Sequence, residues 1–178
     1  KNQFVYLHSK IRKMLITIDV GNSRIKVAVF EQDILLDLIV VDPNEALPFF
    51  SGIFIQYPKI EKALFSSVGK FDNNVLAFIQ KQVNTLVINQ HTKFPFSNHY
   101  ATPETLGIDR MVLAAGATIM FPNKNRLVID AGTCVTYDFV DQDNRYFGGA
   151  ISPGISMRYK SLNDYTENLP WLEKKEVD

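Results

Sequence analysis

Two short segments of the sequence carry an aspartate, a glycine and a hydroxyl residue in the same order. Asp19-Val20-Gly21-Asn22-Ser23 follows one apolar run, and Asp130-Ala131-Gly132-Thr133 follows another. An aspartate at the end of a strand can hold a metal ion or a water molecule, glycine lets the backbone approach a ligand closely, and the amides after it can surround phosphate oxygens. Two such turns could bind a polyphosphate between them. Asp-x-Gly is also ordinary hairpin chemistry, so either turn alone could be purely structural.

A third group of residues with chemical potential is Gly107-Ile108-Asp109-Arg110, which lies between the two turns in the sequence. In the first turns of a helix, the aspartate could act as a general base and the arginine could anchor a substrate. The alternative is a surface ion pair, with the carboxylate favoured by its position near the start of the helix.

Both turns lie within a repeated pattern of three strands. In the first copy, apolar runs at 15–19, 25–29 and 34–41 are separated by polar turns, and in the second copy they recur at 126–130, 134–140 and 146–151. Each copy predicts an antiparallel three-strand unit. A duplicated unit predicts two similar lobes that face a cleft, hinged near Asn123, with Asp19 and Asp130 approaching each other across it.

The segments between the two copies alternate between strand and helix patterns. Helices are predicted at 44–56 and 73–82, strands at 64–68 and 85–88, and a loop at 91–100. Thr102, Pro103 and Glu104 predict the start of a helix that reaches Met120, and another helix is expected after Gly154. This alternation indicates an α/β protein with a partly parallel sheet.

Composition limits the classes of function. The 178 residues include 19 basic and 19 acidic side chains, so the net charge is 0 and we expect no nucleic-acid partner. The apolar runs are shorter than the ~20 residues of a membrane span, and Asp19 ends the first run too early for a secretion signal. The single cysteine, Cys134, cannot form an internal disulfide, which favours the cytoplasm. Residues 1–13 are expected to be an extension before a native start at Met14.

The three motifs together resemble those of the type III pantothenate kinases, a family within the sugar kinase, heat-shock protein and actin superfamily. Gly148-Gly149-Ala150-Ile151-Ser152-Pro153-Gly154 resembles the glycine-rich turn of that family. The resemblance implies an α/β, two-lobed, duplicated actin-like ATPase fold of the ribonuclease H-like type. It divides the chain into residues 14–123, the first lobe with the pantothenate motif, and residues 124–178, a second lobe that is expected to be C-terminally incomplete.

The same resemblance implies ATP-dependent phosphorylation of pantothenate to 4'-phosphopantothenate, the first step of coenzyme A biosynthesis. It makes Asp109 the general base, Asp19 the organiser of Mg²⁺, and Asp130 the ligand of a monovalent cation, K⁺ or NH₄⁺. The implied nucleotide contacts are Asp19, Val20, Gly21, Asn22, Ser23, Arg24, Ile25, Lys26, Gly132 and Thr133. The implied pantothenate contacts are Tyr100, Gly107, Ile108, Asp109 and Arg110. Members of the family are homodimers.

The sequence departs from the family pattern at two points. Ser23 stands where threonine is common, and the family continues beyond the equivalent of Asp178 with a further substrate-contacting threonine and contacts to adenine. Two alternatives are kept: a non-catalytic regulator that binds nucleotide or pantothenate, and a superfamily kinase for a sugar or acetate. Cys134 is expected to be a small buried side chain rather than a nucleophile.

Overall fold

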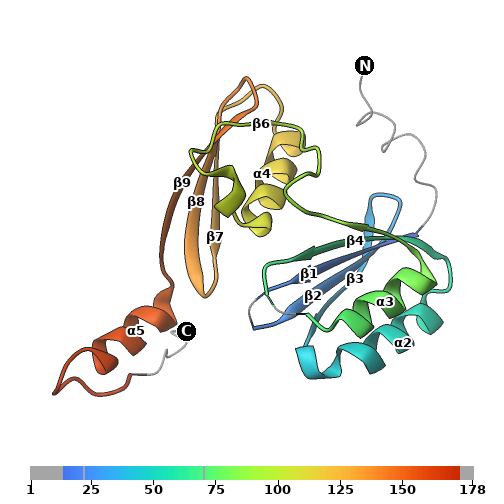
Figure 1. Cartoon of the computed structure of the whole chain (residues 1–178), viewed down its shortest axis with the longest axis horizontal. Coiled ribbons are helices and arrows are strands. Elements are labelled where there is room, and N and C mark those ends of the chain that lie inside the picture. Colours follow the sequence, from blue (N-terminus) through green and yellow to red (C-terminus); the bar gives the residue numbers. More distant parts are fainter. Residues whose placement is uncertain (1–13, 22, 70, 173–178) are drawn as a thin grey trace. The chain divides into compact units, whose positions relative to one another are not determined.

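The computed structural model describes residues 14–21, 23–69 and 71–172, which form two compact units (Figure 1). The first unit contains the described residues up to Lys93 together with Gly107–Asp109, and the second contains Phe94–Leu106 and the described residues from Arg110 onward. The predicted extension at 1–13 and the predicted phosphate contact Asn22 lie outside the described residues. In the three described ranges, no helix is long and apolar enough to cross a membrane.

The first unit is built on a mixed sheet in the strand order β3-β2-β1-β4-β5. Neighbours are antiparallel from β1 through β2 to β3, whereas β4 runs parallel to β1, and β5 runs parallel to β4. Its strands within the described residues are β1 (Met14–Val20), β2 (Ile25–Glu31), β3 (Ile34–Val41), β4 (Ile60–Ser67) and β5 (Asn84–Val87).

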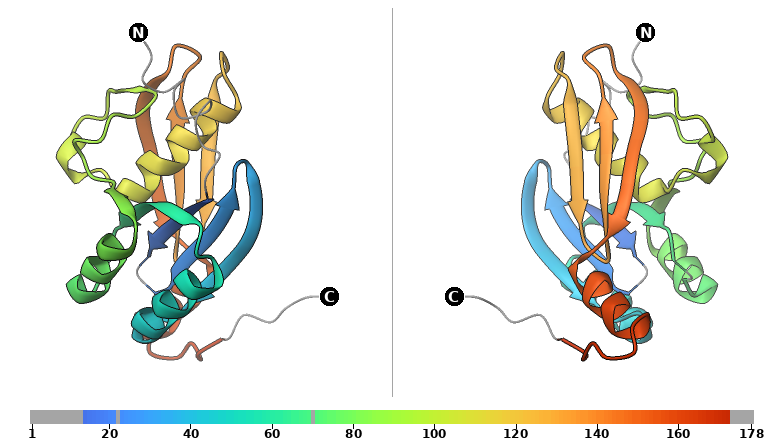
Figure 2. Two further views of the ribbon diagram at one scale, coloured as in Figure 1. Left: turned by 90° about the vertical axis from the view of Figure 1, so that its right-hand side faces the viewer. Right: turned by 90° about the vertical axis from the view of Figure 1, so that its left-hand side faces the viewer.

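Apolar side chains from the sheet and two helices form the core of the first unit. Every second residue of β1 is buried, as the period of a half-buried strand requires. The helices α2 (Ala46–Gln56) and α3 (Asn73–Gln82) cover one face of this sheet and bury Phe50, Ile53, Val75 and Ile79 against it (Figures 1 and 2). The 3-10 turn η1 (Pro43–Glu45) precedes α2. At the start of α3, the side chain of Asp72 accepts a hydrogen bond from the amide of Asn74, which satisfies a donor that the helix leaves unpaired.

The second unit contains a sheet in the order β6-β9-β8-β7, with β7, β8 and β9 antiparallel and β6 parallel to β9. The helix α4 (Ile108–Met120) lies against this sheet, and α5 (Ile155–Asp164) follows its last strand (Figure 1). The 3-10 turn η2 (Pro103–Thr105) precedes α4. The strands of this sheet within the described chain are β6 (Ser97–Asn98), β7 (Arg126–Ala131), β8 (Cys134–Val140) and β9 (Arg145–Pro153).

The α/β class and the repeated antiparallel three-strand unit of the predicted actin-like fold are confirmed. The predicted continuous helix from Thr102 to Met120 is wrong. The chain forms η2 first, then Leu106 adopts an extended conformation with φ −70° and ψ 128°, and α4 begins only at Ile108. The residues that resemble the glycine-rich turn of the family belong to β9 up to Pro153, which agrees with the strand predicted at 146–151. The division into lobes at 14–123 and 124–178 stays a prediction.

Candidate functional site

The first Asp-x-Gly turn places a carboxylate at the end of β1. Asp19 is half-buried, and its Oδ1 accepts a hydrogen bond of 2.9 Å from Oγ of Ser66 on the parallel strand β4. Ser66 and Lys26 are the residues paired with Asp19 on either side of it in the sheet. Cross-strand neighbours of this kind have their side chains on one face, within reach of each other. Asp19 is therefore a carboxylate held by a hydroxyl on β4, with a lysine opposite it on β2.

The backbone of this turn is closed by its glycine. The amide of Gly21 donates to the carbonyl of Arg24 at 3.0 Å, and a Cβ at Gly21 would lie 3.3 Å from the same oxygen. The side chains of Val20 and Ile25 are buried in the core, so only their backbone could contact a nucleotide. Ser23, Arg24 and Lys26 are exposed. These exposed residues are the ones whose side chains could contact phosphate.

The second Asp-x-Gly turn is also closed by its glycine amide, but it lies beside the start of a helix, α5. The amide of Gly132 donates to the carbonyl of Cys134 at 2.8 Å, which closes the turn. Gly154, which caps the N-terminus of α5, donates its amide to the carbonyl of Thr133 at 3.0 Å, and a Cβ there would collide with the carbonyls of Gly132 and Thr133. The N-terminus of α5 therefore lies directly against the turn. Unpaired amides at the start of a helix are a favourable place for phosphate oxygens.

Asp130 in this second turn is exposed and lies opposite Thr136 of β8. It thus differs from Asp19, which is half-buried. Across the described ranges, no three His, Cys, Asp or Glu side chains lie close enough together to hold a metal ion by themselves. Any metal at either turn would need oxygen atoms from a bound phosphate, from the backbone or from water.

The third motif lies at the start of α4. Gly107 and Asp109 are half-buried, and Ile108 and Arg110 are buried. Asp109 is in the first turn of the helix, where a negative charge is favourable. The guanidinium of Arg110 donates from Nε and Nη2 to the carboxylate of Asp138 on β8, with a shortest distance of 2.6 Å. The hydrogen bond to Asp138 raises the pKa of Arg110.

The predicted substrate contact Tyr100 lies beside this arginine. The ring centroid of Tyr100 is 5.6 Å from the guanidinium carbon, a cation–π distance. The second unit therefore brings together two of the five predicted pantothenate contacts.

Three residues of these clusters are absent from the sequence-based prediction. Ser66 hydrogen-bonds to Asp19, and Asp138 and Tyr146 lie beside Arg110. The only signal for Asp138 is a charged residue inside an otherwise apolar strand pattern, because a buried carboxylate needs a partner. Nothing in the local sequence singles out Ser66 or Tyr146.

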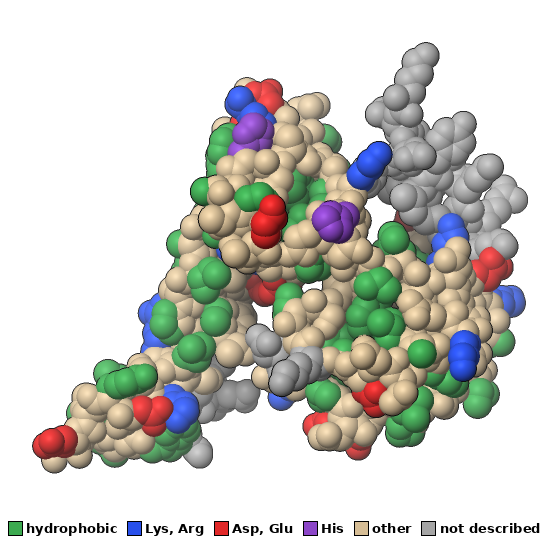
Figure 3. All heavy atoms as spheres, in the orientation of Figure 1, with side chains coloured by type: hydrophobic (Ala, Val, Ile, Leu, Met, Phe, Trp, Pro, Cys, Tyr) green, Lys and Arg blue, Asp and Glu red, His purple; other side chains and the backbone are tan. Residues whose placement is uncertain are grey.

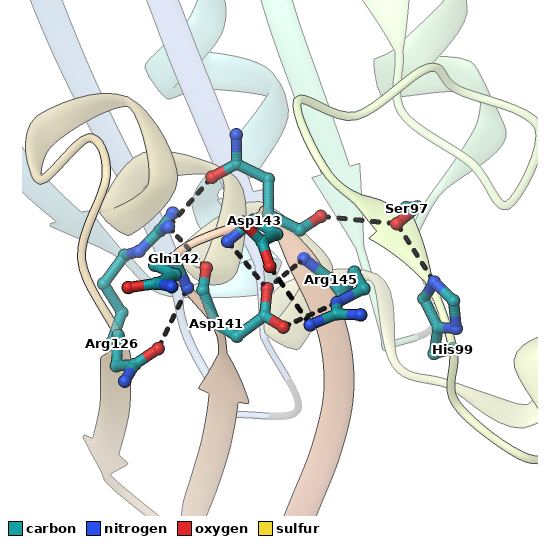
Figure 4. Close-up of polar contacts among 9 residues, drawn as sticks. Ser97, His99, Arg126, Asp141, Gln142, Asp143 and Arg145 are labelled. Atoms are coloured by element: carbon teal, nitrogen blue, oxygen red, sulfur yellow. Dashed lines mark hydrogen bonds and ion pairs between the residues drawn. The ribbon is translucent and has the colours of Figure 1, made fainter.

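Polar residues also cluster at the turn between β8 and β9, but their contacts are those of a structural turn (Figure 4). The carboxylate of Asp141 accepts from the amide and from Nε of Arg145 at 2.8 and 2.7 Å, and Arg126 donates to the carbonyl of Asp141 at 2.6 Å. His99 lies within 3.1 Å of the Ser97 hydroxyl. Cys134, predicted to be buried, is half-buried, with its sulfur 3.9 Å from that of Met157.

Comparison with known proteins identifies the same family that the motifs resemble. Residues 15–178 match the family model for type III pantothenate kinase. A type III pantothenate kinase of Flavobacterium johnsoniae is 50% identical over 159 residues, which cover 89% of this chain and 65% of that protein. One of Flavobacterium psychrophilum is 47% identical over 163 residues, covering 92% and 68%. The chain thus spans about two thirds of the length of these relatives.

One solved structure shares the fold at low identity. It is a Campylobacter jejuni protein named after the Baf family, with a TM-score of 0.52 and 23% sequence identity. The match covers 86% of this chain and 61% of that one. At this identity the likeness concerns the fold alone.

Proposed function

The chain belongs to the type III pantothenate kinase family, and we propose that the protein transfers the γ-phosphoryl group of ATP to the primary hydroxyl of pantothenate. The product is 4'-phosphopantothenate, the first intermediate towards coenzyme A. The observation that carries this proposal is the occurrence of an Asp-x-Gly turn, closed by its glycine amide, at the same point of both three-strand units. Phosphoryl transfer depends mainly on positioning and charge neutralisation, which two phosphate-binding turns can provide.

Asp19 is proposed to bind Mg²⁺. Mg²⁺ usually keeps several waters and takes one or two carboxylates together with substrate phosphates, so a single half-buried carboxylate fits this ion. When bound, the ion neutralises charge on the transferring phosphate. The protein's own contribution is the hydrogen bond from Ser66, which restricts the orientation of the Asp19 carboxylate. The exposed Ser23 and Lys26 would contact phosphate oxygens beside it.

Asp130 is proposed to bind the monovalent cation, K⁺ or NH₄⁺. Its carboxylate is exposed at the end of β7, next to the turn formed by Gly132 and Thr133. A weakly hydrated cation could take this carboxylate and turn carbonyls as ligands, which fits the donor set. Its positive charge would favour a nucleotide phosphate at this turn.

Asp109 is proposed as the general base that accepts the proton of the pantothenate hydroxyl. Asp19 and Asp130 belong to the phosphate turns, where cations would occupy them, whereas Asp109 lies at the start of α4. A carboxylate in hydrogen-bond reach of the hydroxyl can contribute about 10² to 10⁴ in rate. Tyr100, Gly107, Ile108 and Arg110 are proposed to hold pantothenate beside it.

A homodimer is proposed from the family resemblance, and a cytoplasmic location from the single cysteine. Sedimentation equilibrium would test the oligomeric state.

The activity would be tested with the protein in its natural length, by following ADP release with and without pantothenate. We expect ADP release that requires pantothenate and a product 80 Da heavier than pantothenate by mass spectrometry. ATP binding with no pantothenate-dependent turnover would instead support the regulator, and turnover only with a sugar or acetate would support a different superfamily kinase.

A further inference from the structure

The second unit contains a buried ion pair between Arg110 and Asp138 whose contribution to stability does not explain its presence. The side chains of Arg110 and Asp138 are only 6% and 2% exposed. Removing two charges from water costs about as much as their attraction returns, and apolar replacements of such pairs are often neutral or stabilising. The pair is therefore poorly explained by stability alone, and its geometry suggests orientation.

The geometry of the pair fixes the plane of the guanidinium. Nε of Arg110 lies 3.0 and 3.1 Å from the two carboxylate oxygens of Asp138, and Nη2 lies 2.6 Å from Oδ1. Because Nε and Nη2 belong to one rigid planar group, their hydrogen bonds to the same carboxylate prevent the guanidinium from rotating. Because Arg110 is in the first turn of α4 and Asp138 is in the middle of β8, this contact also ties the start of the helix to the sheet.

The carboxylate is itself held by a second residue. The hydroxyl of Tyr146 on β9 donates to Oδ1 of Asp138 at 2.5 Å, and Tyr146 is fully buried. Burial and the hydrogen bond to Asp138 raise the pKa of Tyr146, so its phenol stays protonated and remains a donor. The ring of Phe96 stacks on Tyr146 with centroids 5.2 Å apart, which restricts the tyrosine in turn.

An aromatic ring also lies over the guanidinium of Arg110, in a space that a glycine leaves open. Tyr100 lies over the guanidinium at 5.6 Å, and its ring occupies the space where a Cβ of Gly148 would be. Gly148 has φ +77°, a conformation that favours glycine. The amide of Tyr100 donates to Oδ1 of Asn98 at 2.9 Å, which fixes the backbone before the ring.

We propose that Asp138 and Tyr146 are positioning residues that orient Arg110, and with it the Tyr100 ring, for binding of pantothenate. This inference rests on the proposed function. Preorganised side chains lose less entropy when a ligand binds, so affinity for the substrate depends on the residues behind them. Neither residue needs to touch pantothenate for this effect.

The test compares Asp138→Asn, Tyr146→Phe and Gly148→Ala with wild type by steady-state kinetics. Tyr146→Phe keeps the stacked ring and removes only the hydroxyl, so it should fold. We expect it to raise the KM for pantothenate about tenfold, as the loss of a hydrogen bond to a charged group predicts, with the KM for ATP unchanged. Asp138→Asn should have a larger effect of the same kind, and Gly148→Ala should act similarly by displacing the Tyr100 ring.

The matched control is Asp141→Asn, which removes a second aspartate–arginine pair from the same sheet without touching Arg110. It should lower thermal stability and leave both KM values near those of wild type. An unchanged pantothenate KM in folded Tyr146→Phe, or equal increases in both KM values, would overturn the inference while the proposed function stands. A wild-type protein without pantothenate-dependent turnover would overturn the proposed function, and this inference with it.

Discussion

The two copies of the three-strand unit have the same connectivity but differ in the burial of their first strands, β1 and β7. In the first copy, Ile16, Ile18 and Val27 are buried in an apolar core under α2 and α3. In the second, Leu127 and Ile129 are 62% and 55% exposed. Apolar side chains lie on the surface of the second unit (Figure 3). The buried polar residues of this copy are Arg126, Asp138 and Asp141. A strand pattern thus specifies the hairpins, while the elements packed on them decide which side chains are buried.

The two Asp-x-Gly turns repeat this contrast at the candidate site. Asp19 lies next to the parallel strand β4, which supplies the Ser66 hydroxyl, whereas β7, the strand of Asp130, is the last in its sheet among the described residues. Asp19 is therefore oriented by the protein, and Asp130 is left exposed. The proposed assignment of Mg²⁺ to the first turn and of the monovalent cation to the second follows this contrast.

The largest effect on turnover is expected at Asp109, the proposed catalytic carboxylate that belongs to neither Asp-x-Gly turn. Asp109→Asn keeps the shape of the side chain and removes the base, so turnover should fall by at least about 10²-fold. Nucleotide binding, measured by calorimetry, should change little because the turns are intact. Near-normal turnover would show that Asp109 only positions pantothenate, as a loose, metaphosphate-like transition state would allow.

The next largest effect is expected on the free energy of unfolding, because apolar side chains are buried in the first unit and exposed on β7 of the second. Phe50 is fully buried, and Phe50→Ala should lower the free energy of unfolding by about 3 to 5 kcal/mol. Ile129→Ala in the second copy should change it by less than about 0.5 kcal/mol, because that side chain is exposed. Urea denaturation measures both. Similar losses in the two variants would show that Ile129 is covered in solution.

A third prediction separates the two turns by their cations. Asp130→Ala should abolish activation by K⁺ or NH₄⁺, because the exposed carboxylate is the proposed ligand, while the Mg²⁺ requirement should persist. Asp19→Ala should show the reverse, with a weakened response to Mg²⁺. Titration of each cation in the ADP-release assay measures both responses. Unchanged K⁺ dependence in Asp130→Ala would place the monovalent site elsewhere.

Elements that depend on residues close together in the sequence could be predicted, whereas contacts between residues far apart in the sequence could not. Several elements follow from local periodicity and turn residues, and β3, α3 and β8 begin and end where predicted. The start of α4 does not, because Thr102 and Pro103 satisfy the local rules for a helix start while the chain extends again at Leu106. The contacts of Ser66, Asp138 and Tyr146 join different strands or a strand and a helix, so the local sequence does not identify their partners, although a charged residue in the strand pattern marks Asp138. The Asp-x-Gly turns and the Gly107-Ile108-Asp109-Arg110 motif are identified from residue types and spacing, whereas the roles of their residues come from the family resemblance and stay predictions.

The smallest predicted effect concerns the contact that distinguishes the two turns most directly. Ser66→Ala removes the hydroxyl that donates to Asp19 and should lower the free energy of unfolding by about 1 kcal/mol. Because Asp19 then loses its orientation, the Mg²⁺ concentration for half-maximal turnover should rise, by less than tenfold. Ser67→Ala is the matched control, since its hydroxyl donates to the carbonyl of Gly69 instead. If both serine variants shift the Mg²⁺ response equally, orientation of Asp19 by Ser66 is not what sets the first turn apart from the second.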